Sequence, residues 1–288
     1  MPELPDLLHI RRCLRENLLD RAVREAVVKR PVVIRNTLQT PFTEAVKEQR
    51  FVGINLRGPF LRFELSGALD LVLNLMIAGK LQYQRSGEMP LGHLCWSLLL
   101  NDASRLNLCD EKQMAKAYLV HHGDYRHIPR YETQGVDILS DAFTPGSFRD
   151  LALIHRRKQV RVFINDQTIL SAIGNAYADE ILFEARLHPK TFVGKLSPEE
   201  LDRLFSAIPA VMQWGIQKVE EARQPIHIKV REHLKVRNRR GEACLRCGTT
   251  IRREGVRGFD VFFCPHCQPA KRTLFINWQS TGRDGEGS

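Results

Sequence analysis

Apolar residues recur at helical spacing near the start of the chain. Leu7, Ile10, Leu14 and Leu18 fall three or four residues apart, which places them on one face of an α-helix. We therefore predict a helix over residues 6–19. Such a helix would hold the N-terminus against a scaffold.

From Ala22 to about Leu119, short apolar runs alternate with turn signals. The turn signals are Arg57-Gly58-Pro59, Ser66-Gly67, Ser86-Gly87 and Asn101-Asp102. The runs that we predict as strands are 27–34, 51–56, 60–65, 69–75, 95–100 and 105–108. Several short strands at close spacing indicate a sandwich or a barrel.

The second half of the chain has a helical pattern. Residues 120–150 show little periodicity and are interrupted by Gly and Pro, so the domain boundary is predicted there, with a linker at 131–147. Beyond it we predict helices over 148–162, over 166–173 with Asp166 as N-cap, over 176–186, and from Pro198, capped by Ser197, towards Glu221. These helices give domains of 1–130 and 148–235. Residues 223–243 are strongly basic.

Composition narrows the class of protein. The chain has 288 residues, of which 43% are hydrophobic and 26% charged, which is typical of a globular protein with two domains. No apolar run reaches the roughly 18 residues of a membrane span, and the N-terminus does not have the pattern of a signal peptide. A cytosolic monomer is expected. The net charge of +10 favours a polyanionic partner, with nucleic acid ahead of a membrane surface.

Four of the seven cysteines are clustered. Cys244, Cys247, Cys264 and Cys267 form a C-x2-C-x16-C-x2-C pattern, whose thiolates can bind one tetrahedral zinc ion. The alternative is a pair of disulfides, which a reducing cytosol disfavours. His266 is then not needed as a ligand. We predict a zinc finger over 236–272, followed by a tail whose Gly-rich end, from Thr281, is typical of disorder.

The first six residues allow a further reading. Methionine before proline is usually removed, which would leave Pro2 with a free secondary amine, a nucleophile able to form a Schiff base with a sugar aldehyde. Glu3 lies beside it and could handle protons. The alternative is that Pro2 and Pro5 only make the terminus rigid.

Residues 166–189, from Asp166 to Pro189, closely resemble the helix–two-turns–helix motif of the formamidopyrimidine-DNA glycosylase/endonuclease VIII family. In this run Gly174 permits a sharp turn, and Asn175 with the first amides of the next helix can hold a phosphate. The resemblance extends to the Pro2-Glu-Leu-Pro5 start, to residues 234–244, and to the ending Cys264-Pro-His-Cys267-Gln268.

The resemblance implies an α+β fold. A β-sandwich with a leading helix would precede a helix–two-turns–helix domain and a zinc-finger hairpin. It also implies Pro2 as nucleophile at C1′, Glu3 as acid and base, one structural Zn²⁺, and damaged or abasic double-stranded DNA as partner, within the nucleoid if the organism is bacterial. The residues that we assign to DNA contacts are Asn175, Arg161, Arg257 and Lys158.

Other family positions differ in this chain. Relatives carry a catalytic lysine in an Arg-Gly-Lys-Tyr-type hairpin, where this chain has Pro59. The family's wedge methionine falls on Ile77, next to Met76. The family's wedge arginine and phenylalanine align with residues 110–115, where Met114 stands at the position of the phenylalanine. The zinc-finger arginine maps to Phe259, and Arg257 lies two residues earlier, on the same face if the hairpin is regular. The lesion-covering loop, around 218–228, is shorter.

Two hypotheses of different class follow. The first is a glycosylase and abasic-site lyase with altered lesion choice, supported by Pro2 and Glu3. The second is a non-catalytic or regulatory DNA-binding protein, supported by the missing lysine and wedge. RNA binding is a third possibility, because a basic surface also suits RNA. Phe60, Met76 and Met114 are interpreted as core residues ahead of a rebuilt wedge.

Overall fold

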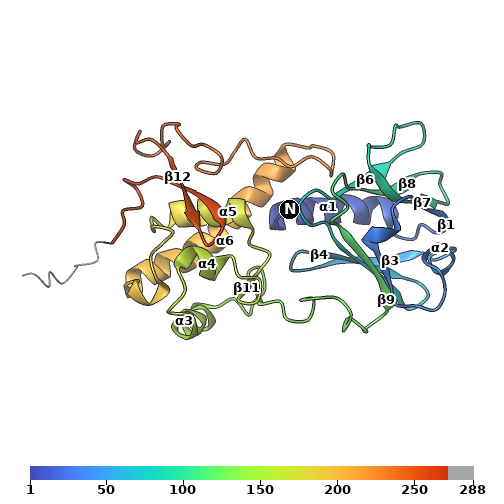
Figure 1. The fold of residues 1–288 in the computed structure, drawn as a ribbon, viewed down its shortest axis with the longest axis horizontal. Helices are drawn as coiled ribbons and strands as arrows, with labels where there is room; N and C mark the ends of the chain where they lie inside the picture. Colours follow the sequence, from blue (N-terminus) through green and yellow to red (C-terminus); the bar gives the residue numbers. More distant parts are fainter. Residues whose placement is uncertain (272–288) are drawn as a thin grey trace, which may run out of the picture.

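Two bodies of different make-up lie side by side along the long axis of the molecule (Figure 1). The computed structural model describes residues 1–271, so the predicted tail lies outside the described residues. Strands dominate the first body, and helices with a β-hairpin form the second. The predicted α+β class is confirmed. Within 1–271, none of the helices is both long and apolar enough to cross a membrane.

The first body is a sandwich of two sheets. The five-stranded sheet has the order β2-β9-β5-β4-β3, and the four-stranded sheet has the order β1-β7-β8-β6. Strand β2 pairs in parallel with β9, whereas the other neighbours in both sheets are antiparallel. The strands are β1 (Val23–Val28), β2 (Ile34–Asn36), β3 (Phe51–Arg57), β4 (Phe60–Leu65), β5 (Leu69–Asn74), β6 (Lys80–Gln84), β7 (Leu94–Leu100), β8 (Arg105–Cys109) and β9 (Lys116–His121).

The predicted strand over 27–34 is wrong as a single element. Strand β1 ends at Val28, a 3-10 turn covers Pro31–Val33, and β2 begins at Ile34 in the other sheet. Proline cannot donate a hydrogen bond to a strand ladder, so Pro31 marks the place where the chain changes sheets. The other predicted strands are confirmed to within a residue or so at each end.

Alternation along the strands builds the core between the sheets. In β4, Leu61, Phe63 and Leu65 are buried in the main cluster, while Phe60 is buried on the opposite face, with its ring edge against Tyr131 at 5.3 Å between centroids. Phe60 is therefore a core residue, as interpreted from the sequence. A short helix, α2 (Phe42–Ala45), closes one end of the sandwich.

The predicted N-terminal helix is confirmed as α1 (Leu4–Leu18). Its stripe of Leu7, Ile10, Leu14 and Leu18 is buried in the core of the sandwich. It begins two residues earlier than predicted because proline is tolerated in the first helical turn. The Asp6 carboxylate also accepts the backbone N–H of Glu3 at 2.8 Å, which satisfies one of the free amides of that turn.

The second body contains α3 (Pro145–Ile154), α4 (Val160–Ile164), α5 (Asn175–Glu184), a 3-10 turn (Val193–Lys195) and α6 (Pro198–Glu221). The predicted helix 148–162 is wrong as one element. Backbone groups of 156–160 instead bond to 191–194, as in Val160 N–H to the Thr191 carbonyl at 2.7 Å. These tertiary hydrogen bonds break the helix between α3 and α4.

The predicted helix 166–173 is also wrong. The Asp166 carboxylate accepts the backbone N–H and the hydroxyl of Thr168, at 3.0 and 2.7 Å, which is a local turn rather than a helix cap. Strand β11 (Leu170–Ser171) then pairs in parallel with β10 (Val136–Asp137). The segment thus forms the two turns of the motif, and β10 attaches the linker to them.

Two further helix predictions are confirmed. The helix over 176–186 is α5, and the helix capped by Ser197 is α6, where the Ser197 hydroxyl accepts the Glu200 N–H at 3.2 Å. Helix α6 packs on both α1 and α5 and so joins the two bodies. At this junction a Cβ on Gly215 would lie 2.3 Å from the ring of Tyr177.

We expect Gly215→Ala to destabilise the protein by about 1–3 kcal/mol, because the added methyl forces Tyr177 out of its packed position. Urea unfolding measures this change. Gly92→Ala is the control, since a Cβ there meets nothing within 4 Å, and its effect should stay within about 0.5 kcal/mol. Equal midpoints for the two variants would contradict the close contact.

Candidate active site and zinc centre

Glu3 joins the N-terminus to the start of α5. Its carboxylate accepts the backbone N–H of Ala176 at 2.9 Å and that of Tyr177 at 3.0 Å. A helix N-terminus stabilises a negative charge through its free amides and its dipole. Among the first amides of α5, which were expected to hold a phosphate, those of Ala176 and Tyr177 are therefore occupied by Glu3 instead.

Gly174 is required by this contact. A Cβ at Gly174 would lie 2.2 Å from the Glu3 carboxyl carbon, closer than any real contact. The role of Gly174 is thus to let a carboxylate from the other body reach α5. Its backbone φ of −99° is open to any residue, so space rather than turn geometry selects glycine here.

The surroundings of the terminus shift the pKa values of the Glu3 carboxyl and of the Met1 amine. Burial raises the pKa of Glu3, against the lowering by its two amide hydrogen bonds. Burial, followed by the nearby charge of Lys229, lowers the pKa of the Met1 amine to about 6. A carboxyl with a raised pKa and an amine with a lowered one are suited to exchange protons near neutral pH.

Arg231 and Asp6 fix the other side of the terminus. The Arg231 guanidinium donates to both Asp6 oxygens, at 2.9 and 2.6 Å, and lies over the ring of Tyr177. The Tyr177 hydroxyl is 3.0 Å from Nε2 of His233. The Arg231–Asp6 pair keeps two buried charges together, because either charge alone would be costly to bury.

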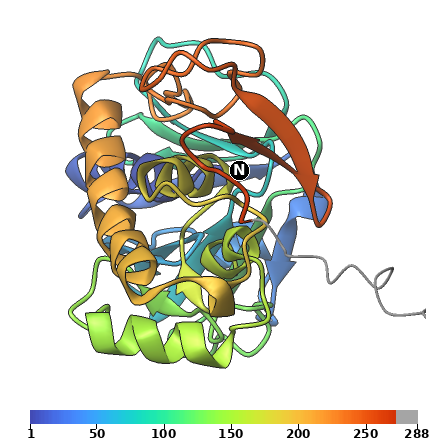
Figure 2. The same cartoon turned by 90° about the vertical axis from the view of Figure 1, so that its left-hand side faces the viewer.

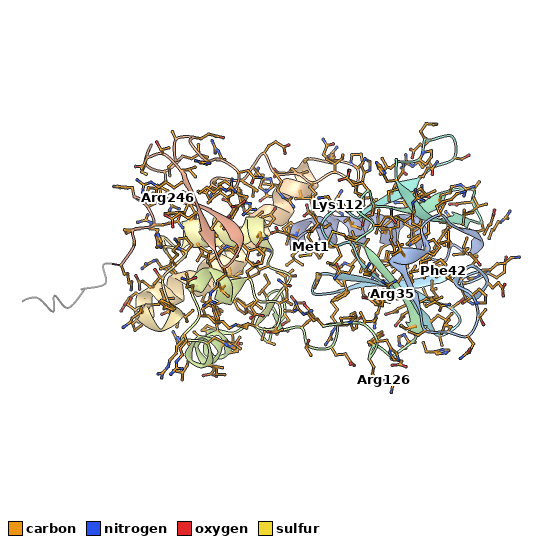
Figure 3. All side chains as sticks on the ribbon, in the orientation of Figure 1. Met1, Arg35, Phe42, Lys112, Arg126 and Arg246 are labelled. Atoms are coloured by element: carbon orange, nitrogen blue, oxygen red, sulfur yellow. The ribbon has the colours of Figure 1, made fainter. Side chains whose placement is uncertain are left out.

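An open cavity of about 310 Å³ lies over these residues. Figure 3 shows Met1 at the junction of the two bodies. The cavity is lined by Met1, Glu3, Asn175, Ala176, Lys229, Arg231, Arg237 and Asn238. Three of these side chains are cationic, which favours a polyanion. All three cations belong to the basic run 223–243. The sequence indicated this run as a whole but did not identify which of its residues line the cavity.

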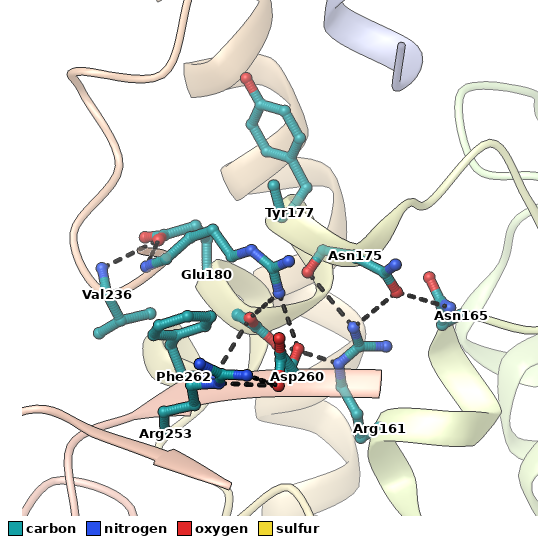
Figure 4. A network of polar contacts seen from close by, with 12 residues as sticks. Arg161, Asn165, Asn175, Tyr177, Glu180, Val236, Arg253, Asp260 and Phe262 are labelled. Atoms are coloured by element: carbon teal, nitrogen blue, oxygen red, sulfur yellow. Dashed lines mark hydrogen bonds and ion pairs between the residues drawn. The ribbon is translucent and has the colours of Figure 1, made fainter. Parts of the chain in front are cut away.

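Arg161 orients Asn175. Its buried guanidinium donates to the Asn175 side-chain oxygen at 2.9 Å and to Asp179 at 3.0 Å (Figure 4). Asn165 donates to the same Asn175 oxygen at 3.2 Å. With its oxygen held by two donors, Asn175 is left with its NH₂ group for a ligand. Arg161 is 2% exposed and acts on Asn175 rather than at the surface.

Asp179 and Glu180 of α5 attach the zinc-finger half to the site. Asp179 is buried between Arg161 and Arg237 and also accepts the Phe262 N–H at 3.2 Å. The Glu180 carboxylate accepts the backbone N–H groups of 235–237 at 2.9–3.0 Å. Figure 4 shows the Glu180 carboxylate beside Val236. Sequence reasoning missed this pair, although two adjacent acidic residues on an apolar helix were a usable signal.

The four predicted cysteines come together. Their sulfur atoms all lie within 4.8 Å of one another, with Cys244 to Cys267 at 4.0 Å and Cys247 to Cys264 at 3.5 Å. Four thiolates about 2.3 Å from one tetrahedral zinc ion have sulfur–sulfur separations of about 3.8 Å. The backbone N–H groups of Arg246 and Cys267 donate to Cys244 and Cys264 sulfurs at 3.4 Å. The site therefore fits Zn²⁺, and the prediction of one structural zinc is confirmed.

The zinc site holds a β-hairpin, β12 (Arg252–Val256) and β13 (Phe259–Phe263), drawn in red at the edge of the molecule in Figure 2. Arg257 and Gly258 form its turn, with φ values of 49° and 83°. The expected same-face relation of Arg257 and Phe259 is wrong, because Arg257 belongs to the turn and not to a strand. Arg257 is nevertheless exposed at the hairpin tip.

Lys158 lies outside the cavity over Glu3. Lys158 belongs to the loop between α3 and α4, and its ammonium forms an ion pair with Asp166 at 2.9 Å. Of the four side chains predicted to contact DNA, the structure thus brings Arg161 and Asn175 together. Lys158 and Arg257 stand apart from them.

The hairpin between β3 and β4, where relatives carry a lysine, is fixed to the interdomain linker. Arg57 donates to the carbonyl oxygens of Tyr131 and Glu132, at 2.7 and 3.2 Å. A Cβ on Gly58 would lie 2.0 Å from the Gln134 side chain. Of the wedge candidates, Met76 and Met114 are half-buried, while Ile77 is 54% exposed and lines a neighbouring hollow together with Lys229.

This arrangement of sandwich, helix–two-turns–helix pair and zinc hairpin around one cationic cavity defines a class of two-domain DNA glycosylases. Three family models match in order along the chain: the formamidopyrimidine-DNA glycosylase N-terminal domain at 1–117, its H2TH domain at 134–224, and a zinc finger found in FPG and IleRS at 241–270. The chain belongs to the formamidopyrimidine-DNA glycosylase family. It is an enzyme of the DNA glycosylase and abasic-site lyase class, and the resemblance noted in the sequence is confirmed.

Full-length relatives support this assignment. The formamidopyrimidine-DNA glycosylase of Pelotomaculum thermopropionicum is 31% identical, covering 94% of this chain and all of the relative. The crystal structure of the MutM (FPG) protein from Thermus thermophilus has a TM-score of 0.81 at 31% identity, over 94% of this chain and 100% of that one. The Lactococcus lactis Fpg in complex with abasic-site DNA has a TM-score of 0.83 at 22% identity, covers 93% of this chain and 100% of that chain, and bears on the fold alone.

We expect Cys244→Ser to reduce bound zinc from one ion per chain to almost none and to unfold the finger, because metal binding worth about 10–16 kcal/mol holds such modules folded. Metal analysis and limited proteolysis of 236–270 measure the two effects. Cys13→Ser is the control, since Cys13 lies on α1 and away from the cluster. Unchanged zinc content in Cys244→Ser would contradict the assignment.

Proposed function

We propose that the protein removes damaged bases from duplex DNA and cleaves the strand at the abasic site, with Pro2 as nucleophile and Glu3 as acid and base. The position of Glu3 carries this proposal. A buried carboxylate stands next to the chain terminus, on the floor of a cavity with three cationic side chains. The cations suit the phosphates of a DNA backbone, and the terminal amine and carboxyl suit the sugar between them.

The chemistry follows from these two groups. Removal of Met1 makes the Pro2 nitrogen a secondary amine, whose lone pair attacks C1′. In base excision the C1′–N bond breaks and the departing base takes up a proton; the C1′–O4′ bond then breaks, and O4′ takes up a proton from Glu3. At an abasic site the aldehyde oxygen leaves as water, with protons delivered by Glu3. Both routes give an iminium at C1′. Loss of a C2′ proton then expels the 3′ phosphate and cleaves the strand.

Double-stranded DNA with damaged or abasic positions is the proposed partner. A relative from Lactococcus lactis was crystallised with DNA containing an abasic site, which supports the proposal for a chain of the same fold. Asn175 would donate its NH₂ group to a phosphate, with Arg161 holding its orientation. Arg257, at the hairpin tip, and Lys158 would contact the backbone farther from the everted nucleotide.

We further propose that lesion choice differs from that of the relatives. Ile77 stands exposed at the position of the family's wedge methionine, and residues 110–115 hold neither the wedge arginine nor the wedge phenylalanine. An isoleucine side chain fills less of the space left by an everted base than methionine, arginine and phenylalanine together. Abasic sites, which need no base removal, would then be favoured substrates.

A member of this enzyme family that binds DNA but has lost the catalytic step is the second candidate. The observation that favours it is the hairpin at Pro59, where the family's lysine is missing and the one cation, Arg57, is bonded to the linker. In this case the cavity would bind an abasic nucleotide without attacking it. The two candidates differ in whether a covalent intermediate forms.

Borohydride trapping on duplex DNA with one abasic site distinguishes them. We expect a covalent band with wild type, because hydride reduces the iminium to a stable amine. Pro2→Gly should reduce the trapping rate by at least about tenfold, and Glu3→Gln should slow it through loss of proton transfer, typically 10²–10⁴-fold. Intact mass of the purified protein, lower by one methionine residue, checks that Met1 is removed. Tight binding without any band would favour the second candidate.

The trapping rate should depend on pH through the terminal amine. Only the neutral amine attacks, and α-amino groups titrate near pH 8 in reference peptides, so the rate should rise with pH as the Pro2 amine loses its proton. Burial lowers the pKa of the neighbouring Met1 amine to about 6, so we expect this rise to begin below pH 8. A constant rate from pH 5 to pH 9 would exclude Pro2 as the nucleophile.

Asn175→Asp tests the phosphate contact without disturbing the fold. Arg161 and Asn165 can bond to a carboxylate as well as to an amide oxygen, so the melting temperature should not fall. The outward NH₂ donor becomes an anion, which should weaken binding to an abasic-analogue duplex by about tenfold or more. Gln39→Glu, an exposed change of equal charge on the sandwich, is the control. Equal affinities for the two variants would remove Asn175 from the DNA contact.

A further inference from the structure

We infer that Lys229 supplies the active-site cation that Pro59 cannot, acting on the terminal amine and on the phosphate beside it. This inference rests on the proposed function, because it assigns a role in the same reaction. Lys229 belongs to the segment between α6 and the zinc finger. It therefore enters the site from the opposite body to the hairpin that carries Pro59.

Lys229 and the chain terminus converge on one atom. The Lys229 ammonium lies 3.3 Å from the carbonyl oxygen of Ile77, and the Met1 amine lies 3.4 Å from the same oxygen. Two amino groups that share one acceptor are close neighbours. Met1 is the residue whose removal frees the Pro2 amine, and Pro2 lines a narrow cleft together with Lys229. Ile77 is itself exposed and lines a neighbouring hollow together with Lys229, so this carbonyl holds the ammonium beside the terminus.

Lys229 also lines three hollows around the terminus. It lines the cavity with Glu3, Asn175 and Arg231, and a narrow cleft that contains Pro2 and Asp6. It also lines a third hollow, of about 250 Å³, beside Ile77 and Asp110. None of the ion pairs between described residues involves Lys229, whereas Arg231 and Arg237 in the same cavity are bound to Asp6 and Asp179. Among the three cations of the cavity, Lys229 is the one whose charge is not used by the fold.

Two consequences follow for the reaction. A positive charge beside the terminal amine disfavours its protonated form, so more of the amine is nucleophilic at neutral pH. The same ammonium, carrying three N–H donors, can bind the phosphate next to the attacked sugar. Lys229 would thus combine activation of the amine with positioning of the substrate.

The experiment compares wild type with Lys229→Gln and Lys229→Arg in borohydride trapping on the abasic duplex, at saturating protein from pH 5 to pH 9. We expect Lys229→Gln to move the rising limb of the pH–rate profile by about one pH unit to higher pH, which lowers the rate about fivefold at the wild-type midpoint and leaves it unchanged at high pH. Lys229→Arg keeps the charge and should restore the limb. Lys47→Gln, on the exposed surface near α2, is the control and should match wild type.

Salt dependence gives an independent readout. On an abasic-analogue duplex, Lys229→Gln should lower the slope of log affinity against log salt by about 0.9, the value for one lost phosphate contact. The inference would be overturned if Lys229→Gln left both the pH–rate profile and the salt dependence of affinity unchanged. It would also be overturned if the trapping rate fell by the same factor at every pH, because that result indicates a structural role. If wild type itself gives no covalent band, the proposed function fails first, and the role of Lys229 fails with it.

Discussion

The contact between the Glu3 carboxylate and the first amides of α5 is the constraint on which the rest of the site depends. It crosses from the first residues of the sandwich to the first turn of a helix in the other body. Gly174 exists to admit it, and Asp6 with Arg231 encloses the same terminus from the far side. A carboxylate at a helix N-terminus is held in one orientation by charge as well as by hydrogen bonds. The terminus is therefore positioned by the junction of the two bodies rather than by either alone.

Helix α5 carries this organisation on to the zinc finger. Glu3 meets its first turn, Asn175 opens it, and Asp179 and Glu180 bind the segment that leads into the finger. Zinc binding stabilises the hairpin of β12 and β13. The Phe262 N–H of β13 then donates to Asp179 and so attaches the hairpin to α5. Arg237 of the cavity donates to the Asp260 carbonyl oxygen of this hairpin at 2.8 Å, so the finger helps to position one of the three cations. Loss of the finger would consequently be felt in the cavity.

Much of this was accessible from the sequence, because the signals were local. The stripe of α1, the turns between strands and the spacing of four cysteines each depend on residues close together in the chain. Two of the errors came from tertiary contacts, whereas those at 27–34 and 166–173 came from local features, Pro31 and the Asp166–Thr168 turn. Hydrogen bonds from 191–194 divide the helix predicted over 148–162, and Glu3 takes the amides that a phosphate was expected to use. Lys229 was hidden for the same reason, since only the fold brings residue 229 to residue 77.

The linker has a mechanical consequence. Arg57 holds it at Tyr131 and Glu132, β10 joins it to β11, and the Tyr125 hydroxyl donates to Asp70 of the sandwich at 2.6 Å. A connection fastened to both bodies along its length leaves little freedom for a hinge, and α6 closes the opposite side of the junction. We therefore expect the angle between the bodies to be set before DNA arrives. The enzyme then loses little conformational entropy on binding, and the deformation needed to expose a nucleotide falls almost entirely on the duplex.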